Sequence, residues 1–311
     1  MEIKKLKIKD YETENNLFLA PMAGYTDFAV RSLFLNVGAG LAFTELISAK
    51  GLEYNVNGSE KLLYSEDYSK TAAQLFGHEE YYLRAAMESE ILKDYKICDI
   101  NMGCPVPKIC KNGDGSALLT DGKKAEKIIK ECVKSGKIIT VKIRTGIKEG
   151  DDVAEEFAKI AEGSGASLLT VHGRVREKYY SGEPDYNAIA KAKKAVKIPV
   201  IANGGIFTEE DADKMINETG ADGIMLARGA LSDVFLFEKL QGVKPDFDKK
   251  TFIFTQLDKQ SERFGEKFTA IAFRKFVPYY FKNAENAKGH RIRLMQTTSV
   301  EEIKDIINEI L

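Results

Sequence analysis

The sequence predicts an α/β protein built as a closed (β/α)8 TIM barrel, followed by a small all-helical C-terminal domain. Three observations support this. Eight short apolar runs recur between residues 17 and 226, and most are separated by stretches with apolar residues at every third or fourth position. Strict alternation of strand and helix favours a parallel sheet, and eight such units in about 240 residues fit a closed barrel. The strand pattern stops near residue 242, where helical spacing takes over.

The predicted elements follow from these patterns. Helical spacing is clearest at 79–93, 121–135, 152–163, 185–195 and 208–218, and Thr208 followed by acidic residues indicates a capped helix start. A doubly wound sheet is disfavoured because Ala-Pro-Met-Ala-Gly, not a glycine-rich fingerprint, follows the first strand. The expected strands are 17–21, 39–44, 70–75, 97–101, 138–143, 167–171, 198–202 and 222–226.

The region after residue 242 has its own character. We expect a catalytic barrel over 1–242 and a helical domain over 243–311, with helices at 251–264, 267–284 and 299–311. Between Arg263 and Arg293, eight basic residues stand against two acidic ones, although the whole chain has a net charge of −1. Such a segment suits nucleic-acid phosphates, and the alternative is a solvated helix face.

Composition narrows the class of protein. The 311 residues are 44% hydrophobic and 30% charged, as in ordinary soluble proteins, and no apolar stretch suggests membrane insertion or secretion. The four cysteines are too few and too irregularly spaced for a disulfide framework or a zinc site. We therefore expect a cytoplasmic protein without a metal and without an obligate protein partner.

Polar residues gather where the predicted strands end, which is where barrels of this type place reactive groups. The two-residue period puts Lys142 and Arg144 on one face, and likewise His172 and Arg174. A single Arg or His is often merely exposed, but polar ends on six strands favour a shared site.

Two strand ends and one loop suggest specific chemistry. Gly204 and Gly205 allow backbone amides to approach an anion, the helix opened by Thr208 would face the same place, and Arg228 can bind phosphate oxygens. A tight turn without a ligand is the alternative. Cys104 lies between Gly and Pro on the loop after the fourth strand, where a reactive role is favoured over core filling.

The ordered motifs carry a family resemblance. The string DINMGCPVPKICKNGDGSALL is preceded by APMAGYTD and followed by VKIRTG, TVHGR, IANGGI and ARGAL. Together they resemble the tRNA-dihydrouridine synthase family of flavin barrels. The segment FRKFVPYYFKNAENAKGHRIRLMQ is similar to that family's helical tRNA-binding domain. The Asn-x-Gly-Cys-Pro string is specific, whereas Asn-Gly-Gly and Ala-Arg strings occur in many phosphate-binding barrels.

The resemblance implies FMN as cofactor, NADPH as reductant, tRNA as substrate and Cys104 as the proton donor. Reduction of a uracil needs a hydride, which no side chain supplies, and a proton, which a thiol can give. Cofactor contacts are implied for Pro21, Met22, Ala23, Gln74, Lys142, His172, Asn203, Gly204, Gly205, Ala227 and Arg228. We expect substrate contacts from Asn101, Arg144 and Arg174 in the barrel and from Arg274, Lys275, Arg291 and Arg293 in the tail.

Three positions depart from the family pattern. Gly205 stands where Asp is frequent, Ala227 where Gly is frequent, and Phe276 where His is common. Two other functions remain open on the sequence alone. One is a flavin barrel acting on a free small molecule, similar to dihydroorotate dehydrogenase, against which the basic tail argues. The other is an RNA-binding protein without catalysis, against which Cys104, Lys142 and His172 argue.

Overall fold

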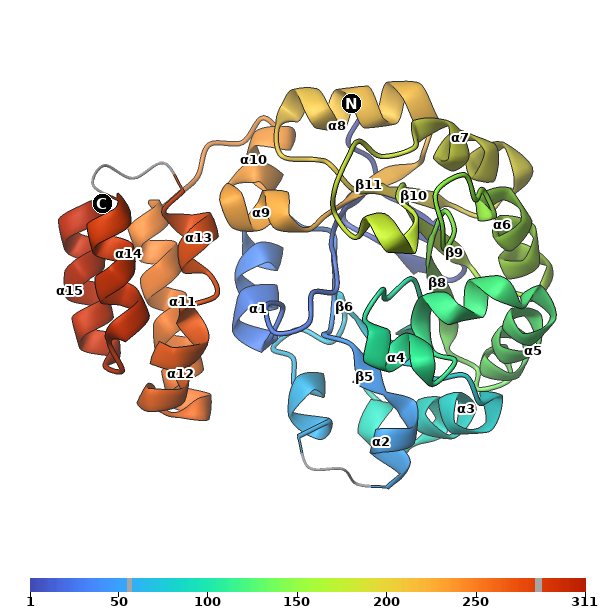
Figure 1. Cartoon of the computed structure of the whole chain (residues 1–311), viewed down its shortest axis with the longest axis horizontal. Coiled ribbons are helices and arrows are strands. Elements are labelled where there is room, and N and C mark those ends of the chain that lie inside the picture. The colour runs from blue at the N-terminus through green and yellow to red at the C-terminus, as the bar shows by residue number, and fades with distance from the viewer. Residues whose placement is uncertain (55–57, 283–286) are drawn as a thin grey trace.

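A computed structural model describes residues 1–54, 58–282 and 287–311. Its central feature is a closed parallel barrel whose last strand pairs with its first, Met225 facing Phe18 (Figure 1). All eight predicted strands are confirmed, with ends that differ from the predicted ones by at most two residues. The barrel strands are β3 (Leu17–Leu19), β4 (Leu41–Phe43), β6 (Thr71–Phe76), β7 (Ile97–Met102), β8 (Ile138–Arg144), β9 (Leu168–His172), β10 (Val200–Asn203) and β11 (Gly223–Leu226).

The second barrel strand is interrupted. A short strand, β5 (Ile47–Ser48), continues the course of β4 along β6, with Phe43 opposite Ala72 and Ile47 opposite Leu75. Four residues thus advance along one strand while three advance along its neighbour, which is the geometry of a bulge. The bulge turns Leu46 toward the mouth of the barrel.

Helices surround the barrel as predicted, and the expected capping box at Thr208 is confirmed. Thr208 accepts the amide of Asp211, whose carboxylate accepts the Thr208 amide in return. The α-helices of this region are α1 (Phe28–Asn36), α2 (Ala49–Glu53), α3 (Glu80–Glu88), α4 (Pro107–Lys111), α5 (Gly122–Val133), α6 (Ala154–Gly163), α7 (Tyr186–Ala195), α8 (Glu209–Thr219), α9 (Arg228–Ser232) and α10 (Leu236–Leu240). The 3-10 turns are η1 (Glu60–Leu63), η2 (Glu90–Leu92), η3 (Gly115–Thr120) and η4 (Arg176–Lys178).

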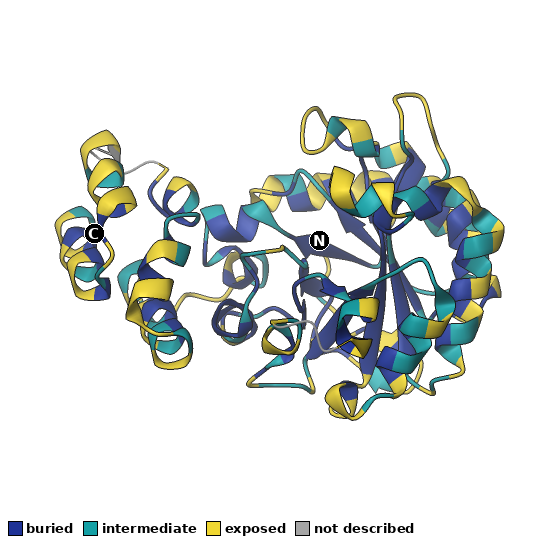
Figure 2. Cartoon of the chain, turned by 60° about the horizontal axis from the view of Figure 1, so that its bottom comes forward, coloured by how far each residue is buried: buried dark blue, intermediate teal, exposed yellow. Residues whose placement is uncertain are grey.

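The inside of the barrel changes character along its axis. At the amino-terminal end it is filled by apolar side chains such as Phe18, Phe43 and Ile201, and Figure 2 shows most of the barrel strands as buried. A small hairpin that the sequence did not predict, β1 (Lys7–Ile8) with β2 (Tyr11–Glu12), adds Ile8 to this cluster. Two residues further along several strands, the inward positions become polar. The polar layer forms the floor of the site described below.

The C-terminal helices pack against α1 and α9, away from α5 and α6 (Figure 1). They are α11 (Lys249–Phe264), α12 (Glu266–Phe273), α13 (Val277–Tyr280), α14 (Ala287–Gln296) and α15 (Val300–Ile310). The prediction of one helix over 267–284 is wrong, because helical structure is interrupted between the end of α12 and the start of α13. Pro278 lies in the first turn of α13, where proline is tolerated. Residues 283 and 284 of that prediction lie outside the described residues, and α14 was not predicted.

The tail and the barrel share one hydrophobic core. Phe252 of α11 packs against Phe34 of α1 with ring centroids 5.4 Å apart, and Phe264 packs against Phe28 at 5.6 Å. We propose that the boundary between the barrel and the helical domain lies at residue 242. Within the described ranges, none of the helices is both long and apolar enough to span a membrane.

Candidate active site

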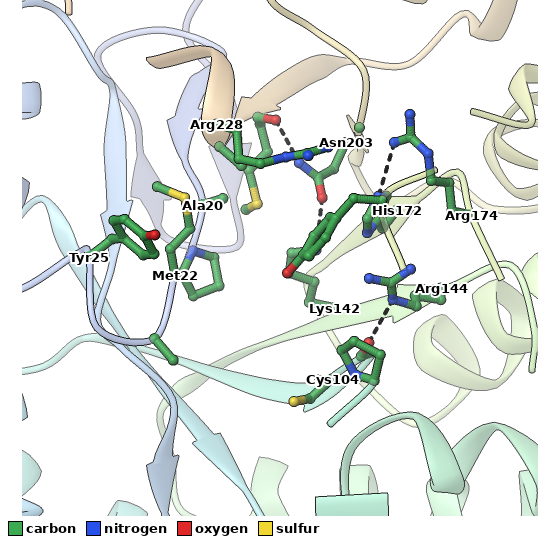
Figure 3. A pocket seen from close by; sticks show the side chains of 18 of the residues that line it. Ala20, Met22, Tyr25, Cys104, Lys142, Arg144, His172, Arg174, Asn203 and Arg228 are labelled. Atoms are coloured by element: carbon green, nitrogen blue, oxygen red, sulfur yellow. Dashed lines mark hydrogen bonds between the residues drawn. The ribbon is translucent and has the colours of Figure 1, made fainter. Parts of the chain in front are cut away.

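A cavity of about 460 Å³ opens at the carboxyl ends of the barrel strands (Figure 3). This volume lies in the usual range for small-molecule and cofactor sites. The cavity is lined by every barrel residue expected to be the proton donor or to contact cofactor or substrate: Pro21, Met22, Ala23, Gln74, Asn101, Cys104, Lys142, Arg144, His172, Arg174, Asn203, Gly204, Gly205, Ala227 and Arg228. The structure therefore brings the predicted residues together, while their individual roles remain predictions.

The floor of the cavity is a chain of buried amides and a carboxylate. Asp99 accepts hydrogen bonds from Thr140 (2.5 Å) and from Gln74 Nε2 (2.7 Å), and burial raises its pKa to about 6. Gln74 Oε1 in turn accepts from Asn101 Nδ2 at 3.0 Å. Both polar atoms of the Gln74 side chain are thereby fixed, so its orientation toward the cavity is set by its neighbours.

Lys142 stands at the centre of this floor. Its ammonium donates to Asn203 Oδ1 at 3.0 Å, and Asn203 Nδ2 donates to the Met225 carbonyl at 2.7 Å. Burial, reinforced by the nearby Arg144 charge, lowers the pKa of Lys142 to about 7. A buried ammonium in this state favours a ligand that brings negative charge or strong acceptor oxygens.

His172 lies beside Lys142 and faces the same cavity. Burial, followed by the charges of Arg144 and Lys142, holds the pKa of His172 well below its usual range. The imidazole is consequently neutral near pH 7, and its Nε2 lies 3.4 Å from the Arg174 guanidinium. A neutral ring can line a cofactor or base without adding another positive charge.

Arg144 and Arg174 hold the loops that frame the cavity. Arg144 donates to the carbonyls of Gly103 (2.9 Å) and Tyr179 (2.8 Å), and Arg174 donates to the carbonyl of Gly182 (2.6 Å). Both guanidinium groups therefore fix backbone in addition to lining the cavity. That they also contact substrate remains a prediction.

Cys104 enters the cavity from the loop after β7, across from Asn203 and Arg228 in Figure 3. Asn101 Oδ1 accepts the Cys104 amide at 2.9 Å, and the Cys104 carbonyl accepts the Ser116 amide at 3.1 Å. Burial raises the pKa of the Cys104 thiol. The thiol therefore keeps its proton at neutral pH, as a proton donor requires.

Tight glycine turns form the opposite end of the cavity. Gly204 and Gly205 have φ values of 114° and 72°, and a Cβ on Gly229 would lie 2.0 Å from the Ile206 carbonyl oxygen. A Cβ on Gly205 would lie 2.8 Å from Pro184, so this chain favours glycine at the position. Arg228 begins α9 and lies over the Tyr180 ring at 4.5 Å.

The helix that follows Thr208 does not reach the cavity in the way that the sequence predicted. Thr208 is not among the residues that line the cavity, and the Asp211 carboxylate accepts the amides of Phe207 and Thr208. These two amides, which precede α8, are therefore not available to a phosphate. The short helix α9 starts at the cavity in its place, with Ala227, Arg228 and Gly229.

The tail residues predicted to contact substrate lie in different surroundings. Arg274 donates to the carbonyl of Thr297 at 3.1 Å, Arg291 to that of Phe281 at 2.8 Å, and Arg293 forms an ion pair with Glu309. Lys275 turns toward the barrel, where its ammonium lies 5.7 Å from the Tyr25 ring centre. Burial lowers the pKa of Lys275, against the attraction of Asp27 and Glu45. None of these contacts tests RNA binding.

The sequence did not predict that five aromatic residues line the cavity: Tyr25, Tyr179, Tyr180, Phe207 and Tyr279. Tyr25 follows the Ala-Pro-Met-Ala-Gly string directly, so its position beside that motif was a usable signal. Tyr279 belongs to α13 and meets Tyr25 edge to face, with ring centroids 5.8 Å apart. Helical spacing alone cannot show that a tail residue reaches the barrel mouth.

Known proteins resemble this chain over nearly its whole length. The family model described as dihydrouridine synthase (Dus) matches residues 18–310. A "Probable tRNA-dihydrouridine synthase" from Rickettsia conorii is 34% identical over 298 residues, 92% of this chain and 90% of the relative. A "tRNA-dihydrouridine synthase B" from Pseudomonas putida is 33% identical over 299 residues, covering 93% of this chain and 89% of the relative.

Solved structures share the fold at low sequence identity. Histamine dehydrogenase from Rhizobium sp. 4-9 superposes with a TM-score of 0.60 at 11% identity, over 91% of this chain and 53% of that one. The structure of TcOYE with pHBA gives a TM-score of 0.57 at 12% identity, over 77% of this chain and 92% of that one. These likenesses concern the barrel architecture.

Proposed function

Because the chain belongs to the dihydrouridine synthase family, we propose that it reduces uridines in transfer RNA to 5,6-dihydrouridine, with FMN as cofactor and NADPH as reductant. The single observation that carries the proposal is the cavity itself. It combines a buried ammonium, a protonated thiol and a glycine-lined end with an arginine, all at the mouth of one barrel.

The residues present fit a flavin mononucleotide. The glycine turns of Gly204 and Gly205 together with Arg228 suit its phosphate. Lys142 suits the polar part of the ring system, since a buried ammonium with a lowered pKa gains from an acceptor-rich partner. Pro21, Met22 and Ala23 would lie against the ring, Gln74 and His172 at its edge, and Asn203 and Ala227 near the remaining polar groups.

The chain's own residues would divide the remaining work. When bound, the reduced flavin supplies a hydride, which no side chain can do. Cys104 holds a proton at its Sγ and would give it to the uracil carbon next to the one that receives the hydride. Asn101 fixes the Cys104 amide and so orients the donor.

The substrate must bring a base out of a folded RNA, at a cost of a few kcal/mol. The basic tail would offset that cost by binding phosphates, with Arg274, Lys275, Arg291 and Arg293 as the first candidates. The same tail weighs against a barrel acting on a free small molecule. The assembled thiol and ammonium weigh against a binding protein without catalysis. A cytoplasmic location and the absence of an obligate protein partner stay predictions.

The test compares tRNA from cells with and without this protein by mass spectrometry. We expect at least one uridine to lose two hydrogens' worth of mass in the deleted strain, and the purified protein to be yellow and to oxidise NADPH when that tRNA is added. Identical tRNA from both strains, together with a colourless protein that binds no added FMN, would overturn the proposal.

A further inference from the structure

The loop that carries Cys104 is fixed at both of its ends. We define the thiol loop as residues 103–116, between β7 and the first residues of η3. At its start, Asn101 Oδ1 accepts the amides of Gly103 (3.2 Å) and Cys104 (2.9 Å). Near its end, the Ser116 amide returns to the Cys104 carbonyl, which also accepts from Cys110 Sγ at 3.3 Å. The position of the thiol thus depends on where the far end of the loop is held.

A histidine just beyond the end of a neighbouring strand holds that far end. His78 Nδ1 lies 2.8 Å from Asp114 Oδ1, and the His78 ring lies 3.5 Å from the position that a Cβ on Gly113 would occupy. Asp114 is 7% exposed, so this bond replaces much of the hydration that its carboxylate loses on burial. Neither residue is among those that line the cavity.

One strand, β6, therefore reaches both ends of the thiol loop. Gln74, within β6, binds Asn101 at the start of the loop, and His78, two residues beyond β6, binds Asp114 at its end. A loop tied at its two ends to one rigid strand has little freedom to move its middle. Ordinary solvation of the histidine would not require a nearly buried partner on this loop.

We propose that His78 and Asp114 form a positioning pair that holds Cys104 where it can deliver its proton. The proposal rests on the function assigned to Cys104 above. A proton donor has to lie within hydrogen-bond reach of its acceptor, and a misplacement of about 1 Å can cost about 10²-fold in rate. The pair acts through Cys104 and does not touch the reacting base.

The test uses the full-length flavin-bound protein and three variants. His78→Ala removes the bond, His78→Asn keeps a side-chain amide donor near the place of Nδ1, and Lys111→Ala is the control, since Lys111 is an exposed residue of the same loop. Two rates are measured. One is reoxidation of the reduced flavin by tRNA taken from cells lacking the protein. The other is alkylation of Cys104 by iodoacetamide, mapped after tryptic cleavage at Lys108, which separates Cys104 from Cys110.

We expect His78→Ala to slow tRNA-dependent reoxidation by about 10- to 100-fold through kcat, with KM for tRNA nearly unchanged. Flavin reduction by NADPH should stay at the wild-type rate, because that step does not use the thiol. The alkylation rate of Cys104 should change at least several-fold. His78→Asn should restore most of both rates, and Lys111→Ala should alter neither.

The two proposals fail separately. If Cys104→Ala reduces tRNA at the normal rate, the proton-donor role is lost, while the alkylation rate still reports on the loop. If His78→Ala leaves both reoxidation and alkylation unchanged, the positioning pair is overturned. Should His78→Ala not fold, Asp114→Ala takes its place, because it removes the acceptor of the same hydrogen bond from the loop side, and normal values of both rates in that variant would overturn the pair.

Discussion

The buried charge of Lys142 destabilises the folded flavin-free protein by an amount that can be measured. Burial lowers its pKa from 10.5 to about 7, so the folded chain disfavours the charged ammonium. Below pH 7 the group is protonated in both the folded and the unfolded state, and the penalty is present in full. As the pH rises from 7 to 10.5 the unfolded chain binds more protons than the folded one, and the penalty disappears.

The size of the effect follows from the pKa difference. At about 1.4 kcal/mol per pKa unit, the full penalty at low pH is at most about 5 kcal/mol. About 4 kcal/mol of it remains at pH 7, and roughly 2 kcal/mol more is relieved between pH 7 and pH 9. Lys142→Met keeps an unbranched side chain and removes the charge, but it leaves Asn203 Oδ1 without its donor, which costs about 1 kcal/mol. The flavin-free variant should therefore be more stable than wild type at pH 7 by about 1 to 3 kcal/mol.

Urea unfolding of the flavin-free proteins at pH 7 and pH 9 measures this difference. The stability advantage of Lys142→Met should shrink by about 2 kcal/mol between the two pH values, because only the wild type has a buried lysine charge that is lost as the pH rises. Lys123→Met, a change at an exposed position of α5, is the control and should follow wild type at both pH values. If the unfolding free energies of Lys142→Met and wild type depend equally on pH, the view that the buried charge of Lys142 destabilises the fold is refuted. The same variant should bind FMN more weakly.

Three further predictions concern the remaining parts of the site. Arg228→Ala should lower FMN retention by about 10-fold or more while the barrel stays folded, as measured by fluorescence titration, because a charge-assisted phosphate contact contributes about 1.5–3 kcal/mol; unchanged affinity would place the phosphate elsewhere. Cys104→Ala should leave flavin reduction by NADPH intact and lower dihydrouridine formation by about 10²- to 10⁴-fold, and a normal rate would remove Cys104 from the chemistry. The double change Arg291→Ala and Arg293→Ala should shallow the log-log salt dependence of tRNA affinity by about 0.7–0.9 for each RNA phosphate that the variant no longer binds. Lys275→Ala should change that slope less, because Lys275 is turned toward Tyr25 of the barrel. An unaltered slope in the double variant would mean that Arg291 and Arg293 form only a solvated face.

The barrel and the cavity floor could be predicted because they depend on local patterns. A two-residue period identifies which side chains of a strand point inward, and a closed parallel barrel brings all carboxyl ends to one mouth, so Lys142, His172 and Asn203 had to meet there. The spacing of Gly204 and Gly205 likewise indicated a turn. The surroundings of the α8 start could not be predicted, since only the structure shows that Asp211 accepts the amides of Phe207 and Thr208 and that Thr208 does not line the cavity.

The tail could not be predicted in the same way, since the role of a charge there depends on which helix face packs against the barrel. Lys275 belongs to the basic segment in sequence but faces Tyr25, Asp27 and Glu45 in the fold. His78 and Asp114, 36 residues apart, gave no motif that would pair them. Contacts between distant segments carry no periodicity, so a sequence read locally does not contain them.

The shared core changes how the tail has to be tested. Deleting residues 243–311 would uncover Phe34 of α1, which packs against Phe252, and would remove Tyr279 from the cavity wall. Exposing buried aromatic rings costs about 1.5–3 kcal/mol each, a large part of the stability of an ordinary domain. Loss of activity in such a truncation would therefore report on folding and cavity shape as well as on RNA binding. A charge change at the exposed Arg293 of α14 leaves Phe252 and Tyr279 in place, so it separates RNA binding from the integrity of the site better than a truncation does.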